Sequence, residues 1–428
     1  MSLFKRIVCV AVICLCLQPI ASEAAAKPRL QVWLKMEYMA TANDVLKRQC
    51  DEFGRKHNVD VQVSFIPGAE MVKKFAAAIE AGTLPDVAEL DTSEPVRFRD
   101  MGLLLDVTDV AQEIAGNQGG YIPMLLPLVK EGERFYGVPF NNSAVVMFVR
   151  TDLLNAAGLE IPKTYDDLLE VGKKISNPKK GIYGVGSTYN RSDDGENVVR
   201  TILWAFGSRM TAEDGRTVTF NSPETLAAVK YMAELSKATM PPGIMGWTDP
   251  SNNEAWIAGE IGITFGPPSI YWQVQNPPHP LGPHTVMAAP PVGPAGGAIM
   301  CQPWTFAVFK KTKNPDLAKD LVRHLMEKEN LWEYIEASGG FSGPSTFEGY
   351  QHPLWKSSPS LQAYAEALQS PDCKLYGWPG PVTAGACEVR ARRLVCDMMS
   401  NVLVNGRTPE QAVAQCEKEL KDLYSRYE

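Results

Sequence analysis

The sequence is poor in histidine and lacks the motifs of several common enzyme classes. Only five histidines occur among 428 residues. No phosphate-loop pattern, H-E-x-x-H helix or G-x-S-x-G elbow is present. Carboxylates are plentiful, but no pair stands out by position as a general acid and base. These absences argue against nucleotide hydrolases, zinc proteases and α/β-hydrolases, and we expect no catalytic residues, no metal and no cofactor.

Long hydrophobic runs are also scarce. One apolar run, over residues 7–17, follows Lys5 and Arg6 and precedes small residues up to Ala26. It is shorter than the roughly 20 residues that cross a bilayer, so we expect a signal peptide over residues 1–26 that is cleaved on export to the periplasm. Leu15, just before Cys16, is larger than the residue usual at lipid-attachment sites, so a lipid anchor is the less favoured alternative.

An excess of positive charge is absent too. Removing residues 1–26 takes away two positive charges and one negative charge, so the net charge changes from −7 to −8. A strongly acidic chain does not suit nucleic acid, and we expect no such partner. The 402 remaining residues are too many for one ordinary core and enough for two domains.

Cysteine pairs with metal-site spacing are missing. Six cysteines remain after cleavage, no C-x-x-C pair occurs among them, and the histidines are scattered, which argues against zinc. An oxidising compartment permits disulfides, although six cysteines allow 15 pairings. Because four cysteines lie in the last 60 residues, we expect local bridges there. The six are Cys50, Cys301, Cys373, Cys387, Cys396 and Cys416.

What is present is an alternation of strands and helices. The chain starts with a predicted β-α-β-α-β unit, which is typical of a mostly parallel sheet that binds ligands at the carboxyl ends of its strands. The unit comprises a strand over 29–35, a helix with a capping box at Thr41 and Asp44, a strand over 59–66, a helix ended by Gly82, and a strand over 86–90.

The alternation continues along the rest of the chain. Capping signals predict helices that begin after Thr164, Ser222 and Thr408. Residues 267–297 are rich in Pro and Gly, which predicts an irregular connection. A strand follows at 304–309. We therefore expect an α/β protein with two lobes and several chain crossings between them.

Seven segments, in order, resemble the extracellular solute-binding proteins of ABC importers, the family of the maltose-type sugar receptors. They are AGTLPDV (81–87), YGVPFN (136–141), TDLL (151–154), AGL (157–159), PKTYDDL (162–168), IAGEIGIT (257–264) and KTKNP (311–315). The resemblance implies a type II periplasmic binding protein fold with a ligand cleft between lobes. One lobe would comprise 27–140 and 297–345, and the other 141–296 and 346–428.

The resemblance also implies where a sugar would bind. Amides, hydroxyls and carboxylates suit sugar hydroxyls, because these groups donate or accept hydrogen bonds. Three sets follow strands or lie where the chain first passes between lobes. They are Glu37 with Tyr38, then Asp91, Thr92 and Ser93, then Asn141, Asn142 and Ser143. For each residue, a turn or solvated surface position remains the alternative.

Aromatic rings are expected to pack on the apolar faces of a sugar. Trp304 is the preferred candidate, whereas for each of the others a core position is the favoured interpretation. The other candidates are Trp204, Trp247, Trp272 and Trp378.

Two segments depart from the family. The chain reads FGPPS after Thr264, so Gly266 is retained but the stacking aromatic is missing or shifted to Tyr271 or Trp272. Near the C-terminus, Arg390, Arg392 and Arg393 share a predicted helix. An arginine in the cleft would favour an acidic or esterified sugar; a solvated helix face is the preferred interpretation.

The resemblance implies a monomeric receptor that captures a sugar or sugar-derived solute and delivers it to the membrane permease. Two alternatives remain open. One is a thiaminase-like transferase on the same fold, with Cys301 as its nucleophile. The other is a receptor for a chemosensory or sensor-kinase partner.

Overall fold

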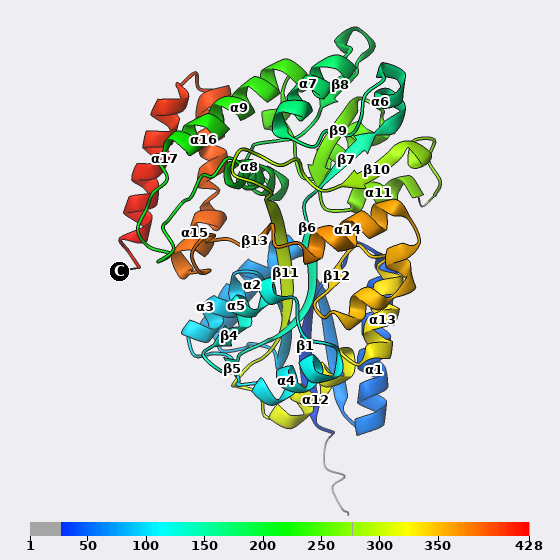
Figure 1. Ribbon diagram of the computed structural model, residues 1–428. Helices are drawn as coiled ribbons and strands as arrows, with labels where there is room; N and C mark the ends of the chain where they lie inside the picture. The colour runs from blue at the N-terminus through cyan, green and yellow to red at the C-terminus, as the bar shows by residue number, and fades with distance from the viewer. Residues whose placement is uncertain (1–26, 276, 428) are drawn as a thin grey trace, which may run out of the picture.

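The protein has two lobes, each built around its own sheet (Figure 1). The computed structural model describes residues 27–275 and 277–427. The predicted signal peptide, including Cys16, lies outside the described residues. No helix in the described part of the chain is both long and apolar enough to cross a membrane.

The first lobe contains the larger sheet, which has seven strands within the described residues. The strand order is β12-β6-β11-β3-β1-β2, and β13 pairs with β11 beside this path. β1 is parallel to β2 and β3, whereas β11 is antiparallel to β3 and β6. The bounds are β1 Arg29–Lys35, β2 Asp60–Ile66, β3 Val87–Asp91, β6 Val138–Ala144, β11 Ile299–Val308, β12 Gly343–Pro344 and β13 Cys373–Lys374.

The second lobe contains the smaller sheet, which has four strands in the order β10-β7-β9-β8 among the described residues. Only the β8–β9 pair is parallel there. The bounds are β7 Val146–Arg150, β8 Tyr183–Val185, β9 Ile261–Gly266 and β10 Thr285–Ala288; a separate hairpin joins β4 Lys130–Glu131 and β5 Arg134–Phe135.

Helices cover both faces of each sheet, as Figure 1 shows. In the first lobe they are α1 Ala40–His57, α2 Gly68–Ala81, α3 Glu94–Asp100, α4 Thr108–Asn117, α5 Leu126–Val129, α12 Pro315–Leu325 and α13 Lys328–Ala337. In the second lobe they are α6 Thr151–Ala157, α7 Tyr165–Ile175, α8 Asp193–Ala205, α9 Pro223–Thr239, α10 Ser251–Ile257, α11 Ser269–Gln275, α15 Ala384–Arg392, α16 Leu394–Leu403 and α17 Pro409–Tyr424. α14 Pro359–Gln369 contacts β10 of the smaller sheet and β6 of the larger one.

Most predicted helix starts are confirmed. Thr164 and Asp167 form a reciprocal capping box at α7, and Thr408 does the same with Gln411 at α17. The Ser222 side chain accepts a hydrogen bond from the third residue of α9. These predictions are correct because a capping side chain close in sequence accepts hydrogen bonds from the free amides of the first helical turn.

Three local expectations are wrong. Thr41 does not cap α1, which begins at Ala40, because the Thr41 hydroxyl donates to the carbonyl of Ala337 on α13. The sheets are mixed rather than mostly parallel, because β6 and β11 cross between the lobes and enter the larger sheet antiparallel to each other. The Pro/Gly-rich stretch 267–297 contains α11 and β10.

The buried core is distributed unequally between the two sides of the molecule. One cluster continues from the larger sheet through α14 to α10 and α11, which cover one face of the smaller sheet. A second cluster fills the space between the smaller sheet and α7, α8, α9, α16 and α17. The lobes are therefore packed together at α14, while the opposite side, near α15, contains a cavity.

Candidate functional site

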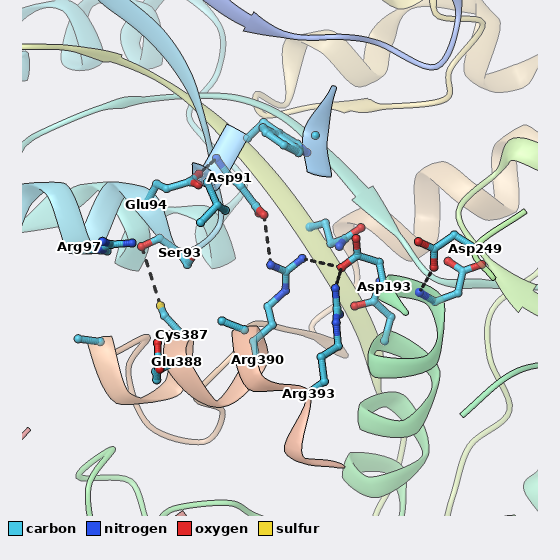
Figure 2. A pocket seen from close by; sticks show the side chains of 18 of the residues that line it. Asp91, Ser93, Glu94, Arg97, Asp193, Asp249, Cys387, Glu388, Arg390 and Arg393 are labelled. Carbon is cyan, nitrogen blue, oxygen red and sulfur yellow. Dashed lines mark hydrogen bonds and ion pairs between the residues drawn. The ribbon is translucent and has the colours of Figure 1, made fainter. Parts of the chain in front are cut away.

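A cavity of about 910 Å³ lies between the two lobes. The first lobe contributes β3, β11, α2 and α3, and the second lobe contributes α8 and α15 (Figure 2). This size falls in the range of small-molecule binding pockets. Its main polar and aromatic side chains are Asp91, Glu94, Arg97, Asp193, Asp194, Asn197, Asp249, Gln302, Trp304, Glu388, Arg390 and Arg393.

A chain of ion pairs crosses this cavity. Arg390 Nη1 on α15 lies 3.3 Å from Asp91 Oδ2 at the end of β3, and Arg390 Nη2 lies 3.4 Å from Asp193 Oδ1 on α8. Arg393 Nη2 approaches the same Asp193 oxygen at 2.6 Å. Figure 2 shows Arg390 between the two carboxylates. One guanidinium therefore links a strand end of the first lobe to a helix of the second.

The start of α15 and a neighbouring aromatic ring fix the position of Arg390. The Thr383 side chain accepts from the Ala386 amide, which fixes the start of α15. The Arg390 guanidinium lies over the Tyr376 ring at 4.7 Å from its centroid. Burial disfavours the charged form, but Tyr376 and Asp91 outweigh this effect and raise the pKa of Arg390 further above its usual value. The arginine is thus held charged and oriented.

Two carboxyl groups of the cavity have strongly altered proton affinity. Burial, with the nearby charge of Asp91, raises the pKa of Glu94 to about 8. Burial, with Asp249 and Asp193, raises the pKa of Asp194 to about 8. Glu94 Oε2 accepts a hydrogen bond from the Asp91 amide at 2.6 Å. The cavity therefore offers protonated carboxyls that donate hydrogen bonds as well as carboxylates that accept them.

Trp304 is, with Tyr427, one of the two aromatic side chains that line the cavity within the described part of the chain. It lies on β11 opposite Asp91 in the sheet register, so both side chains occur at the same strand position. Lys35 Nζ lies 4.4 Å from the centroid of its ring. A half-buried ring beside carboxylates and guanidinium groups suits a ligand that has both apolar faces and a polar rim.

The family model of bacterial extracellular solute-binding proteins matches residues 36–331, which is more than half of the chain. The chain belongs to this family. It is 23% identical over 386 residues, 87% of each chain, to an Escherichia coli K12 protein whose name describes an ABC transporter periplasmic-binding protein.

Solved structures share the fold of this solute-binding protein. A Thermotoga lettingae solute-binding protein bound to α-D-tagatose has a TM-score of 0.78 and 20% identity, covering 93% of this chain and 100% of that one. Maltose-bound MalE3 of T. maritima has a TM-score of 0.78 and 24% identity, covering 92% and 99%. The two-lobed α/β fold expected from the sequence is thereby confirmed.

Three of the predicted ligand residues line the cavity of this solute-binding protein: Asp91, Ser93 and Trp304. Gly266 lies at its edge, since a Cβ there would come 3.3 Å from Asn252 Nδ2 and 3.8 Å from Asp194 Oδ2, and the next residue, Pro267, lines the cavity.

Two further predicted residues, Glu37 and Asn141, belong to a covered cluster outside the cavity lining. Tyr334 on α13 donates to Glu37 Oε1 at 3.0 Å and accepts from Asn141 Nδ2 at 2.9 Å. Lys35 Nζ lies 3.3 Å from Glu37 Oε2. The covered cluster comprises Lys35, Glu37, Glu89, Asn141 and Tyr334.

The other predicted polar residues also lie outside the cavity lining. Thr92 is buried and its hydroxyl donates to the Pro303 carbonyl at 3.4 Å. Asn142 and Ser143 are buried in β6, opposite Pro303 and Gln302 of β11. Tyr38 accepts a 2.6 Å hydrogen bond from Gln273 of α11. Tyr38 therefore links the lobes on the side away from the cavity lining.

Four predicted tryptophans lie elsewhere. Trp204 is buried and packs edge-on against Trp378, with 6.3 Å between ring centroids. Trp247 is half-buried against both large clusters. Trp272 is so close to Gly339 that a Cβ there would lie 2.4 Å from its ring. These rings fill space within or between the lobes, a role that sequence cannot distinguish from ligand stacking.

The arginine interpretation requires correction. A solvated helix face is confirmed only for Arg392, whose side chain is 45% exposed, whereas Arg390 and Arg393 line the cavity. Sequence reasoning also missed Glu94, Asp193, Asp194 and Asp249 as cavity residues. The only local signal was the run Ser192-Asp193-Asp194 at a helix start, which is equally typical of an exposed N-terminus.

Cys301, the nucleophile of the transferase alternative, is fully buried and is not among the cavity-lining residues. Burial also raises its pKa well above the usual thiol value. The described residues contain no group of three His, Cys, Asp or Glu side chains suited to a metal ion.

Proposed function

We propose that this solute-binding protein captures a sugar or sugar-derived solute in the periplasm and delivers it, as a monomer, to the permease of an ABC importer. The observation that carries the proposal is the cavity between the lobes, in which Trp304 lies beside paired carboxylates and arginines. Family membership supports solute binding, and the tagatose-bound and maltose-bound proteins of the same fold support a sugar.

The chemistry of the cavity fits a polyhydroxylated ligand. The C–H face of a sugar ring packs on an indole, while its hydroxyls bind groups that donate and accept hydrogen bonds. Asp91 and Asp193 accept, the protonated Glu94 and Asp194 donate, and Arg390 donates. Because Arg390 and Arg393 already pair with carboxylates, we favour a neutral sugar over an acidic or esterified one.

Ligand binding would shift an equilibrium between open and closed lobes. The Asp91–Arg390 contact spans the two lobes on the cavity side and would separate on opening. The packed α14 side would act as the pivot, with crossings near residues 141, 300 and 345. The lobe boundaries expected from the sequence, 27–140 with 297–345 and 141–296 with 346–428, stay a prediction. They assign part of β6 and all of β13, which pair with β11 in the larger sheet, to the second lobe.

A thermal-shift screen tests the ligand class. The chain without residues 1–26 would be screened against neutral oligosaccharides, monosaccharides, polyols, and acidic or phosphorylated sugars. A ligand at 100 times its Kd stabilises the folded state by about 2.7 kcal/mol, which raises the unfolding midpoint measurably. Stabilisation by neutral sugars only is expected; stabilisation by none of these compounds would contradict the proposal.

Small-angle X-ray scattering tests the closure. We expect the radius of gyration to fall when a ligand found in the screen is added at saturation. The matched control is the Trp304→Ala variant at a ligand concentration that saturates the unmodified protein but not the variant. An unchanged scattering profile with bound ligand would rule out the proposed closure.

A further inference from the structure

Two cysteines far apart in sequence meet at the strands that join the lobes. Cys301 on β11 and Cys373 on β13 have their Sγ atoms 2.6 Å apart. The two strands are parallel neighbours, with Cys373 opposite Ile299, so Cys301 and Cys373 project from the same face of the sheet. The backbone itself therefore brings the two thiols into direct contact.

The other four cysteines have different surroundings. The sulfur atoms of Cys387, Cys396 and Cys416 contact oxygen atoms, at 3.9 Å from the Ser93 carbonyl, 3.4 Å from Glu196 Oε2 and 3.8 Å from the Leu394 carbonyl. Cys50 is buried in α1. The six described cysteines are free thiols in the structure, so the local bridges expected near the C-terminus are not seen.

We propose that Cys301 and Cys373 are joined by a disulfide bond in the exported protein. This inference rests on the periplasmic location in the proposed function, because an oxidising compartment is where such bonds form and persist. Each thiol loses its proton, the two sulfur atoms together lose two electrons, and an S–S bond forms. A protein disulfide oxidant of the compartment takes up the electrons and protons by thiol–disulfide exchange and becomes a dithiol.

Burial determines when the bond forms. Burial raises the pKa of Cys301 well above the usual value, so the reactive thiolate is scarce once the strands are packed. Oxidation therefore precedes the final packing of β11 against β13. The finished bond lies under side chains, out of reach of soluble reductants.

The bridge would hold together two parts of the ligand site. Cys301 lies three residues before Trp304 on β11, and the chain continues from Cys373 to α15, which carries Arg390. The bond links two residues that are 72 positions apart in the sequence. It would anchor the segment that delivers the cavity arginines to the strand that delivers the cavity tryptophan.

Thiol counting tests the bridge directly. The chain would be exported to the periplasm, purified, denatured, treated with a maleimide reagent and weighed by mass spectrometry. We expect four labelled cysteines without reduction and six after reduction, with a peptide linking Cys301 to Cys373. The Cys416→Ser control should give three and five. Six labels without reduction, or a different linked pair, would overturn the proposal.

Thermal unfolding gives a second readout. Protein refolded in reductant should melt roughly 5 °C below the oxidised protein, since cross-linking a long loop restricts the unfolded chain. The double variant Cys301→Ala/Cys373→Ala should melt at one temperature whether or not reductant is present. An equal dependence on reductant in that variant would refute the bridge.

The same samples separate this inference from the proposed function. Protein that is stabilised by a sugar but carries six free thiols contradicts only the disulfide. Protein that carries four free thiols and is stabilised by no sugar contradicts only the proposed ligand.

Discussion

Two groups of charged and polar side chains lie next to each other: one faces the cavity between the lobes, and the other, within the first lobe, is covered by α13. The cavity group comprises Asp91, Glu94, Asp193, Asp194, Arg390 and Arg393, and the covered cluster comprises Lys35, Glu37, Glu89, Asn141 and Tyr334.

The two groups share a strand. Glu89 and Asp91 are two residues apart on β3, so they project from the same face. Burial, followed by the charge of Glu37, raises the pKa of Glu89 to about 8, whereas Asp91 reaches the cavity and pairs with Arg390. Two carboxyl groups two residues apart on one strand thus have different surroundings: Glu89 is part of the core and Asp91 lines the cavity.

The largest effect is expected from Lys35→Met in the covered cluster. Removing the ammonium group leaves the Glu37 carboxylate buried without its partner, so the free energy of unfolding should fall by about 3 kcal/mol, measured by denaturant titration. The Lys35→Met/Glu37→Gln variant should recover at least half of the loss. If ligand affinity fell more than tenfold while stability was unchanged, the covered cluster would belong to the ligand site.

The matching change in the cavity is Arg390→Gln. We expect sugar affinity to fall about 100-fold, or about 2.7 kcal/mol, by isothermal titration calorimetry, because the charged donor between Asp91 and Asp193 is lost. Arg392→Gln is the matched control on the same helix and should change affinity less than twofold, since the Arg392 side chain is 45% exposed and is not among the cavity-lining residues. An equal loss of sugar affinity in the two variants would contradict the placement of Arg390 in the ligand site.

A tryptophan pair tests which rings contact the ligand. Trp304→Ala should weaken sugar binding about tenfold, or about 1.4 kcal/mol, through loss of the stacking surface. Trp378→Ala should leave affinity within about twofold at 25 °C, because that ring packs on Trp204 outside the cavity lining. If Trp378→Ala lost more sugar affinity than Trp304→Ala, the binding site would lie outside this cavity.

The smallest effect concerns pH. The pKa values of Glu89 and Glu94 are raised to about 8 from an ordinary 4.5, so the folded protein holds protons that the unfolded chain has released. The contribution of these two groups to the free energy of unfolding is therefore fully present below pH 4.5 and is lost as the pH rises to 8.

Each group should lower the free energy of unfolding by about 1 kcal/mol between pH 7 and pH 8, measured by denaturant titration at both values. Glu89→Gln and Glu94→Gln should each flatten this dependence. Only Glu94→Gln should change how ligand affinity depends on pH, because Glu94 alone of the two lines the cavity. If Glu89→Gln also changed the pH dependence of ligand affinity, the covered cluster would be part of the ligand site.

Local sequence signals predicted helices and strands correctly where residues close in sequence satisfy the hydrogen-bonding groups of the backbone. The strand over 29–35 and the capping boxes at Thr164 and Thr408 are confirmed. The capping box at Thr41 is wrong because its hydroxyl finds a partner on α13, almost 300 residues away. Likewise, the Pro/Gly content of 267–297 did not reveal α11 and β10, which are stabilised by contacts with other elements.

The sequence by itself determined the family, the two-lobed α/β fold and the strand end at which Asp91 lies, because ordered motifs and periodic patterns are local properties. Only the tertiary structure decided which polar groups face the cavity. α13 covers Glu37 and Asn141, whereas α15 and the residue that follows it place Arg390 and Arg393 beside Asp91 of β3 and Asp193 of α8. Burial and pairing depend on distant segments of the chain, so residue type and spacing do not reveal them.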